Sequence, residues 1–328
     1  MKTDAIGALA VEPRAYPALD PPGSATEIAV VVPCFNEELT IGKVVDDFRR
    51  ELPAARIVVI DNNSTDGTAA LAAAHGATVL REPRQGKGFA VQAMFERVDA
   101  DIYVMVDGDD TYAAEMVHAL LAPIRSGVAH MTVGTRLGTR TARSFRRFHV
   151  AGNALVQRLV NWVGGAHLTD IMSGYRAFSR SVVSRLPIVC AGFEVETDLT
   201  LQMLYYRLKI VEVETPYRER PAGSASKLRT FRDGFRVLWT IFTLLRSFKP
   251  LTFFGGIGAL AFVLGLLAGI PPVVDYVTDP EHYVRRVPLA ILATGLMLVA
   301  TGSVFLGVLL HAMNRRLQEL HSVIVRGR

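Results

Sequence analysis

Short apolar runs alternate with longer amphipathic stretches between residues 28 and 110. The runs are rich in β-branched residues, end at proline or polar turn residues, and cover 28–33, 56–61, 77–83 and 101–106. The stretches between them, such as 39–52 and 87–98, repeat their apolar residues with helical spacing. Such short runs suit strands buried on both faces. The alternation predicts right-handed βαβ crossovers, a mainly parallel sheet and the α/β fold class.

The pattern is less regular between residues 128 and 228. Strands are predicted over HMTVGTR (130–136) and KIVEVETPY (209–217). An amphipathic helix is predicted over about 144–163, with one apolar side and one arginine-rich side. Such a helix lies either on a membrane surface or packed on the core. We expect one catalytic-type domain over 28–228, followed by an amphipathic segment over 229–250.

Two uncharged apolar segments follow, LTFFGGIGALAFVLGLLAGIPPVV (251–274) and VPLAILATGLMLVATGSVFLGVLL (287–310). Each is long enough to cross a hydrocarbon core of ~30 Å, and the short gap between them argues against buried helices of a soluble protein. Together they predict a two-helix transmembrane hairpin within 251–312, with a basic tail over 313–328. Basic residues flank the hairpin on one side: Arg229, Arg232, Arg236, Arg246, Lys249, Arg315, Arg316, Arg326 and Arg328.

This charge distribution places both ends of the hairpin in the cytoplasm. It predicts a multi-pass protein of the inner (plasma) membrane whose globular domain is cytoplasmic. The net charge of +5 is explained by the membrane flanks, and no nucleic-acid-binding motif accompanies it. Residues 1–27 lack an apolar core and are Pro-rich, so we expect a disordered tail rather than a signal peptide. Cys34 and Cys190 show no metal-ligand spacing and are expected to be reduced thiols.

Acidic residues follow the fourth predicted strand in VMVDGDDTY (104–112). Asp107 and Asp109 are two positions apart, so on an extended chain both carboxylates face the same way. Carboxylate oxygens suit Mg²⁺ or Mn²⁺, which proteins commonly share with substrate phosphates. The alternative is an acidic loop that caps the next helix through Asp110 or Thr111. Ligands of open parallel sheets bind outside the carboxyl ends of the strands, which favours the metal interpretation.

Other polar segments fall at the same sheet edge. Asp61 ends the second strand and is a candidate acceptor for a base or ribose, whereas the following Asn62 and Asn63 suit a turn. The glycine-rich PRQGKGFA (83–90) is neither a phosphate-binding P-loop nor a G-x-G-x-x-G fingerprint. Its glycines permit close backbone approach, and Lys87 is placed to reach a nucleotide.

Two later segments offer further charged side chains. TDIMSGYRAF (169–178) carries Asp170 and Arg176, and ERPAGSASKLR (219–229) carries donors that suit phosphate oxygens. These donors are Arg220, Ser226 and Lys227. The alternative for the second segment is a basic flank attracted to anionic lipid, and the alternative for Arg176 is a structural ion pair.

These motifs resemble those of the family 2 inverting glycosyltransferases. More narrowly, they are similar to the polyprenyl-phosphate glycosyltransferases, which include dolichyl-phosphate mannose synthases and bacterial undecaprenyl-phosphate glucosyltransferases. The resemblance covers about 28–230 and rests on PCFNE, VIDNNSTDGTA, QGKG, VDGDDTY, GTR, DIMSGYR, GFEVETDL and RPAGSASKL. It implies a GT-A type fold, a nucleotide-diphosphate sugar donor (UDP more than GDP), a polyprenyl phosphate acceptor, Mg²⁺ or Mn²⁺, and a homo-oligomer with a tetramer favoured.

The resemblance also implies roles for individual residues. The nucleoside side would be lined by Pro33, Asn36, Glu37, Asp61 and Lys87. The metal would be held against the diphosphate by Asp107 and Asp109. The lipid phosphate or the diphosphate would be met by Arg136, Arg176, Arg220, Ser226 and Lys227. Asp170, with Asp109 and Arg136, would be catalytic, and the sugar would be contacted by Glu194 and Glu196. The chain departs from the family pattern at Asn62–Asn63, where a second acid is frequent.

The acceptor chemistry bears on Asp170. A phosphate monoester has a second pKa near ~6, so the acceptor is mostly ionised at neutral pH and needs little help from a general base. We therefore expect Asp170 mainly to orient other groups.

Three alternatives are weighed against this function. A processive polysaccharide synthase would carry a Q-x-x-R-W motif, which the chain lacks, and a dehydrogenase would need the missing glycine fingerprint. A non-catalytic sugar-nucleotide-binding partner would bind nucleotide without turnover.

Overall fold

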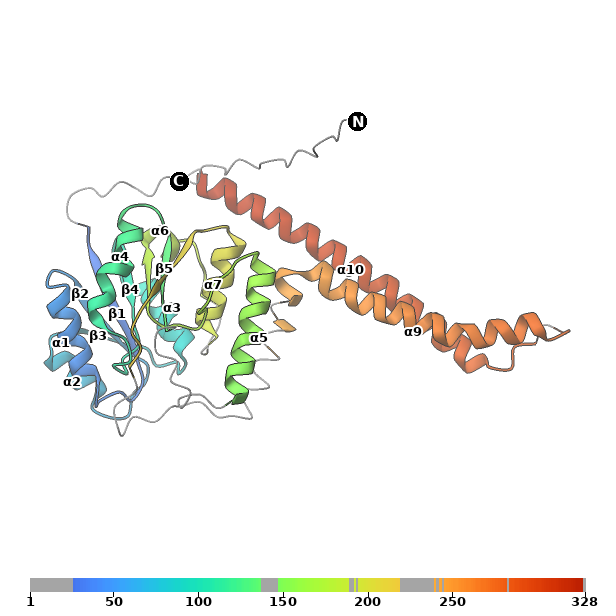
Figure 1. The fold of residues 1–328 in the computed structure, drawn as a ribbon, viewed down its shortest axis with the longest axis horizontal. Helices are drawn as coiled ribbons and strands as arrows, with labels where there is room; N and C mark the ends of the chain where they lie inside the picture. Colours follow the sequence, from blue (N-terminus) through green and yellow to red (C-terminus); the bar gives the residue numbers. More distant parts are fainter. Residues whose placement is uncertain are drawn as a thin grey trace, which may run out of the picture.

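The fold is an α/β domain from which two long helices extend (Figure 1). The computed structural model describes residues 26–136, 147–188, 192, 194–218, 239, 242–243, 245–281 and 283–326. Most of the predicted disordered tail, Cys190, and the segment with Arg220, Ser226 and Lys227 lie outside the described residues.

A seven-stranded sheet forms the centre of the described domain. Its strands, in spatial order, are β3 (Thr78–Arg81), β2 (Arg56–Asp61), β1 (Ile28–Cys34), β4 (Ile102–Met105), β6 (Arg176–Ser179), β5 (Met131–Thr135) and β7 (Ile210–Glu214). β6 is antiparallel to both of its neighbours, and every other pair is parallel. The predicted α/β class with a mainly parallel sheet is confirmed, whereas β6 was not predicted as a strand.

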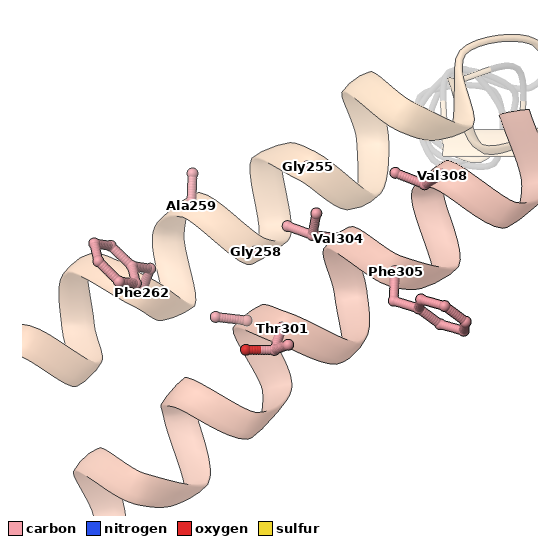
Figure 2. A pocket seen from close by; sticks show the side chains of 9 residues that line it. Gly255, Gly258, Ala259, Phe262, Thr301, Val304, Phe305 and Val308 are labelled. Carbon is pink, nitrogen blue, oxygen red and sulfur yellow. The ribbon is translucent and has the colours of Figure 1, made fainter.

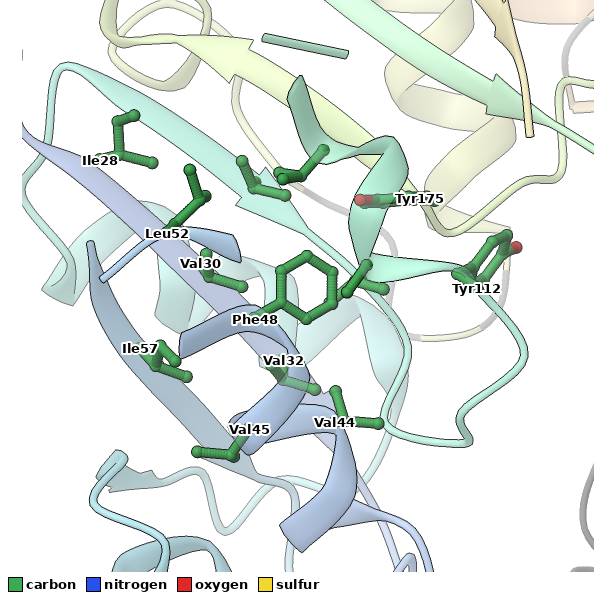
Figure 3. Packing of buried hydrophobic residues seen from close by; sticks show 14 of the residues in the cluster. Ile28, Val30, Val32, Val44, Val45, Phe48, Leu52, Ile57, Tyr112 and Tyr175 are labelled. Atoms are coloured by element: carbon green, nitrogen blue, oxygen red, sulfur yellow. The ribbon is translucent and has the colours of Figure 1, made fainter. Parts of the chain in front are cut away.

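Side chains alternate across the sheet and build a core on each face. Val30 and Val32 of β1 join one cluster, and Ala29 and Val31 join the other. Figure 3 shows the first cluster, where Phe48 packs over the strands. The helices of this face are α1 (Ile41–Glu51), α2 (Thr68–Ala74) and α4 (Val117–Arg125), with the short η1 (Ala114–Met116). The other face is covered by α3 (Lys87–Arg97), α6 (Arg180–Val183) and α7 (Val195–Tyr205).

The predicted amphipathic helix is α5 (Arg147–Gly164). Its Val156 and Val160 pack with Ile171 and Leu201 in a third, small cluster beside the sheet. Other side chains of the same helix, Leu155 and Trp162, are more than half exposed. The helix therefore packs on the core along one side and presents apolar side chains outward along another.

The hairpin consists of α9 (Pro250–Thr278) and α10 (Val287–Arg326). By length and composition, 250–278 and 287–317 are able to cross a membrane, and only 22% and 11% of their most apolar windows are buried. Both helices extend beyond the predicted segments. Gly258 faces Ala300 and Val304 at their contact, and a groove of about 630 Å³ opens between the helices beside it (Figure 2).

Candidate functional site

Three loops meet where β1, β2 and β4 end, because these parallel strands finish at the same sheet edge. Asn36 has a positive φ of 52°, its backbone N–H donates to Ser64 Oγ (3.0 Å), and its Oδ1 accepts from the Thr65 N–H (2.8 Å). Asp61 is buried and accepts from the Ser64 N–H (3.1 Å). The structure thus brings together Asn36 and Asp61, two residues predicted for the nucleoside side.

Two more residues predicted for that side lie close to Asn36 in the chain. Glu37 follows Asn36, and its backbone N–H donates to Thr68 Oγ1 (2.8 Å). Pro33 is within β1, buried and paired with Ile60 of β2. Pro33 therefore helps to form the end of the strand.

Asn62 fastens the glycine-rich loop to the end of β2. The side-chain Nδ2 donates to the carbonyls of Arg84 (2.7 Å) and Glu82 (3.3 Å), and Oδ1 accepts from the Gly86 N–H (2.7 Å). Gly86 has a φ of 146°, which side chains rarely adopt. A carboxylate at position 62 would accept one of these bonds but donate neither of the others. Asn62, which sequence reasoning assigned to a turn, therefore sets the path of the loop leading into Lys87.

Lys87 joins the acidic loop to α7. Its Nζ lies 2.6 Å from Asp107 Oδ1 and also pairs with Glu196 Oε1. The Lys87 side chain is 12% exposed, and those of Asp107 and Glu196 are 25% and 5% exposed. Burial alone would lower the pKa of Lys87, but the two carboxylates raise it above its ordinary value. Lys87 is therefore a charged group. Glu196 pairs with this ammonium, and its predicted contact with the sugar stays a prediction.

The acidic loop does not cap a helix. The residues at the N-termini of η1 and α4 are Ala113 and Met116, and neither makes a side-chain capping bond. Asp109 is buried and accepts from Thr111 Oγ1 (2.6 Å), while Asp110 pairs with Lys43 (2.7 Å). The helix-capping alternative is therefore wrong.

The donor set of this loop fits a hard divalent cation. Asp107 and Asp109 supply carboxylate oxygens, which Mg²⁺ and Mn²⁺ prefer. Within the described residues no group of three or more His, Cys, Asp or Glu gathers as a metal cage. Mg²⁺ commonly binds through one or two carboxylates together with water and substrate phosphates. Asp107 also pairs with Lys87, so this loop carries a carboxylate and an ammonium side by side at the edge of the sheet.

Arg136 and Asp170 form a bidentate pair next to this cluster. Arg136 Nε and Nη2 donate to the two Asp170 oxygens at 2.7 and 2.8 Å, and the Arg136 backbone N–H adds a third bond at 3.1 Å. Burial would raise the pKa of the Asp170 carboxyl, but the bonds from Arg136 lower it below its ordinary value. The Arg136 guanidinium also lies over the Tyr217 ring. Asp170 is thus ionised and fixed in orientation.

Arg176 does not reach this site. Its side chain is completely buried, and the guanidinium donates to the carbonyls of Ser173 (2.8 Å) and Ile171 (2.6 Å) and to Thr200 Oγ1 (2.9 Å). The predicted phosphate contact of Arg176 is corrected: the residue shapes the loop after Asp170 from inside. Glu194, predicted to contact sugar, accepts from the Gly192 N–H (3.2 Å), so its role stays a prediction.

Sequence reasoning missed the aromatic residues beside the acidic loop. The hydroxyl oxygen of Tyr112 accepts from the Gly174 N–H (3.0 Å), and the Tyr112 ring packs on Tyr217. The two tyrosines form an isolated β-bridge, and the Arg218 N–H donates to the Thr111 carbonyl (2.8 Å). The chain that leads into the segment after 218 therefore lies against the acidic loop. Only the three-dimensional pairing reveals this, since a tyrosine in either motif carries no special signal.

The chain is similar to several known proteins. The model of the family "Glycosyl transferase family 2" matches residues 29–186. Glycosyltransferase AglJ of Haloferax volcanii is 33% identical over 240 residues, which are 73% of this chain and 78% of that protein. The dolichyl-phosphate hexose transferase of the same organism is 33% identical over 208 residues, or 63% of this chain and 89% of that protein. The polyprenol monophosphomannose synthase of Mycolicibacterium smegmatis is 28% identical over 213 residues, which are 59% of this chain and 78% of that protein.

Solved structures give the same fold. Glucosyl-3-phosphoglycerate synthase from Mycobacterium tuberculosis, in complex with Mn²⁺ and uridine-diphosphate-glucose, aligns with a TM-score of 0.52 and 27% identity. The alignment covers 67% of this chain and 78% of that one.

Proposed function

The chain belongs to glycosyl transferase family 2, and from that premise we propose that it transfers a hexose from a nucleoside-diphosphate sugar to polyprenyl phosphate. The donor is UDP-linked in this proposal, since the M. tuberculosis neighbour was crystallised with uridine-diphosphate-glucose and Mn²⁺. The acceptor follows from relatives whose names specify dolichyl phosphate and polyprenol monophosphate. The product is a polyprenyl-monophosphate sugar with an inverted anomeric centre.

The residues of the site have distinct tasks in this reaction. Asp107 and Asp109 would hold Mg²⁺ or Mn²⁺, which when bound supplies positive charge beside the departing nucleoside diphosphate. Lys87 adds a fixed ammonium near the same phosphates, because Glu196 holds it in place. Asn36 and Asp61 face the nucleoside, and Asn62 keeps the glycine-rich loop beside it.

Arg136 orients the phosphate of the acceptor, and Asp170 fixes the guanidinium through the bidentate pair. Arg220, Ser226 and Lys227 are proposed to add donors to the same phosphates. Because the acceptor phosphate is already mostly ionised at neutral pH, no residue has to remove a proton before attack. The phosphate oxygen forms the new bond to the anomeric carbon while the bond to the nucleoside diphosphate breaks.

The hairpin of α9 and α10 would hold the domain at the bilayer where the acceptor resides. We propose a multi-pass protein of the plasma membrane with a cytoplasmic domain, following the basic flanks of the two apolar segments. The exposed Leu155 and Trp162 of α5 would contact the membrane surface. A homotetramer is also proposed, since small residues such as Gly255 and Gly302 face open space on the hairpin.

The juxtaposition of the acidic loop with the Arg136–Asp170 pair, in a chain that carries a membrane hairpin, best supports this function. The test incubates purified full-length protein with undecaprenyl phosphate, Mn²⁺ and a panel of radiolabelled UDP- and GDP-sugars. We expect label from one UDP-hexose in the lipid phase as a monophosphate-linked sugar, and at least about 100-fold slower labelling with Asp109→Asn. Nucleotide binding without transfer to any lipid phosphate would instead identify a non-catalytic binding partner.

A further inference from the structure

The C-terminal part of α10 is docked on the α/β domain. Tyr205, the last residue of α7, donates its hydroxyl proton to the Asn314 carbonyl of α10 (3.1 Å). Asn314 in turn donates through Nδ2 to the Ser247 carbonyl (2.8 Å), just before α9. Figure 1 shows the hairpin leaving the domain beside α5. Both arms of the hairpin are therefore tied to one point at the end of α7.

Phe248 connects this point to the third hydrophobic cluster. Its ring meets the Tyr205 ring edge-on, with 5.4 Å between the centroids. It also packs against the cluster formed by Val156 and Val160 of α5, Leu201 of α7, and Ile171. One aromatic side chain from the base of the hairpin thus completes a core that two domain helices share.

The same cluster supports the loop that carries Asp170. Leu168, Ile171 and Met172 all belong to it or pack against it, so the loop 168–172 is fixed on both sides of Asp170. α5 adds polar bonds, because Asn161 donates to the Leu168 carbonyl (2.8 Å) and accepts from the Leu168 N–H (3.0 Å). A continuous series of contacts therefore runs from the hairpin to Asp170, the residue that pairs with Arg136.

We propose that Phe248 and Tyr205 are positioning residues for the transfer reaction. This proposal rests on the proposed function. Together they make the hairpin a structural part of the acceptor side of the site, not only a tether to the membrane. Loosening them lets the loop 168–172 shift, and with it the Arg136–Asp170 pair. Since a misplacement of about 1 Å can cost about 100-fold in rate, the effect falls on turnover. The part of the site proposed to bind the sugar donor, built on β1, β2 and α3, takes no part in this series of contacts.

The test compares Phe248→Ala with Phe262→Ala in the full-length protein in detergent. Phe262 lines the groove of the hairpin away from the domain, so it provides the same chemical change without touching the cluster. The acceptor is a short-chain, water-soluble polyprenyl phosphate, which removes delivery by the bilayer as a variable. We expect kcat to fall about 10- to 100-fold in Phe248→Ala only, with the donor KM within about twofold of wild type. Phe248→Leu, which keeps an apolar side chain, should recover most of kcat.

Hydrogen–deuterium exchange gives a readout that does not depend on turnover. Phe248→Ala should speed exchange in 168–172 while leaving β1 as protected as in wild type. If Phe248→Ala is unfolded in β1 as well, Asn314→Ala, which removes one bond at the joint, replaces it in both measurements. Equal kcat and equal exchange in 168–172 for the Phe248 and Phe262 variants would overturn the proposal. Absence of transfer by the wild-type protein would instead overturn the proposed function, and the exchange result would still decide whether the joint holds the loop.

Discussion

Replacing Lys87 with Met tests the buried cluster at the centre of the site. The substitution keeps a long apolar stem but removes the ammonium that Asp107 and Glu196 share. Breaking a buried ion pair from one side leaves an uncompensated charge and typically costs about 3–5 kcal/mol. Lys43 provides the matched control, because it also pairs with two carboxylates, Asp47 and Asp110, both at 2.7 Å. Its side chain is 51% exposed, so Lys43→Met should cost about 0–1 kcal/mol.

The assay is urea unfolding of the full-length protein in detergent, followed by circular dichroism. With an m-value of about 2 kcal/mol/M, Lys87→Met should lower the urea midpoint by roughly 1.5–2.5 M, and Lys43→Met by less than about 0.5 M. The pKa of Lys87 is raised in the folded protein, against the effect of burial, by the two carboxylates. Its contribution is therefore fully present below its unfolded pKa of about 10.4, and it is lost as the pH rises from there through the folded value.

The difference between wild type and Lys87→Met should consequently stay constant between about pH 6 and pH 9, well below that unfolded value. Equal midpoint shifts for the Lys87 and Lys43 variants would refute the reasoning, because burial would then have no influence on the cost. A difference that disappears as the pH rises toward about 9 would refute the assigned charge state of Lys87.

Three further predictions concern catalysis. Asp109→Asn should lower kcat about 100-fold or more; chelation of metal should abolish turnover of the wild type, and Mn²⁺ should restore it. Gly174→Ala would place a methyl group against the Asp107 carboxylate, so kcat should fall while circular dichroism stays native; unchanged kcat would contradict the close packing. Against the effect of burial, Arg136 lowers the pKa of Asp170, so this pair loses its stabilising effect only as the pH falls through that depressed value. The fall in rate at acidic pH should therefore reflect protonation of the acceptor phosphate, whose pKa is ~6, and not protonation of Asp170. It should persist in Asp170→Asn, and its loss in that variant would contradict the assignment of this fall to the acceptor.

The parts of the fold that follow from local patterns were predictable. The strands β1 to β4 are short apolar runs, and their parallel order follows from the helices between them. The polar loops at their ends could be placed together for the same reason. The strand β6 escaped prediction because its four residues, RAFS, follow a polar motif. Its antiparallel place between β4 and β5 depends on pairing between distant parts of the chain.

The roles of single charged residues were less predictable. Arg176 belongs to a polar motif and so suggested a ligand contact, yet only the fold shows that backbone carbonyls surround its guanidinium. Glu196 lies far along the chain from Lys87, and no spacing rule links them. Asn62 was assigned to a turn, but its bonds to the loop after β3 make it a structural clamp. In each case the deciding partner is a backbone group or a distant side chain, which sequence patterns do not specify.

The central claim is that the loop after β4 binds a divalent cation together with the diphosphate of the donor. Electron paramagnetic resonance of free Mn²⁺, titrated into the full-length protein with and without UDP, measures this directly. We expect wild type to bind one ion much more tightly when UDP is present, and Asp107→Asn and Asp109→Asn to lose that UDP-dependent gain. Mn²⁺ binding that is unaffected by UDP, or equal in wild type and both variants, would contradict the account.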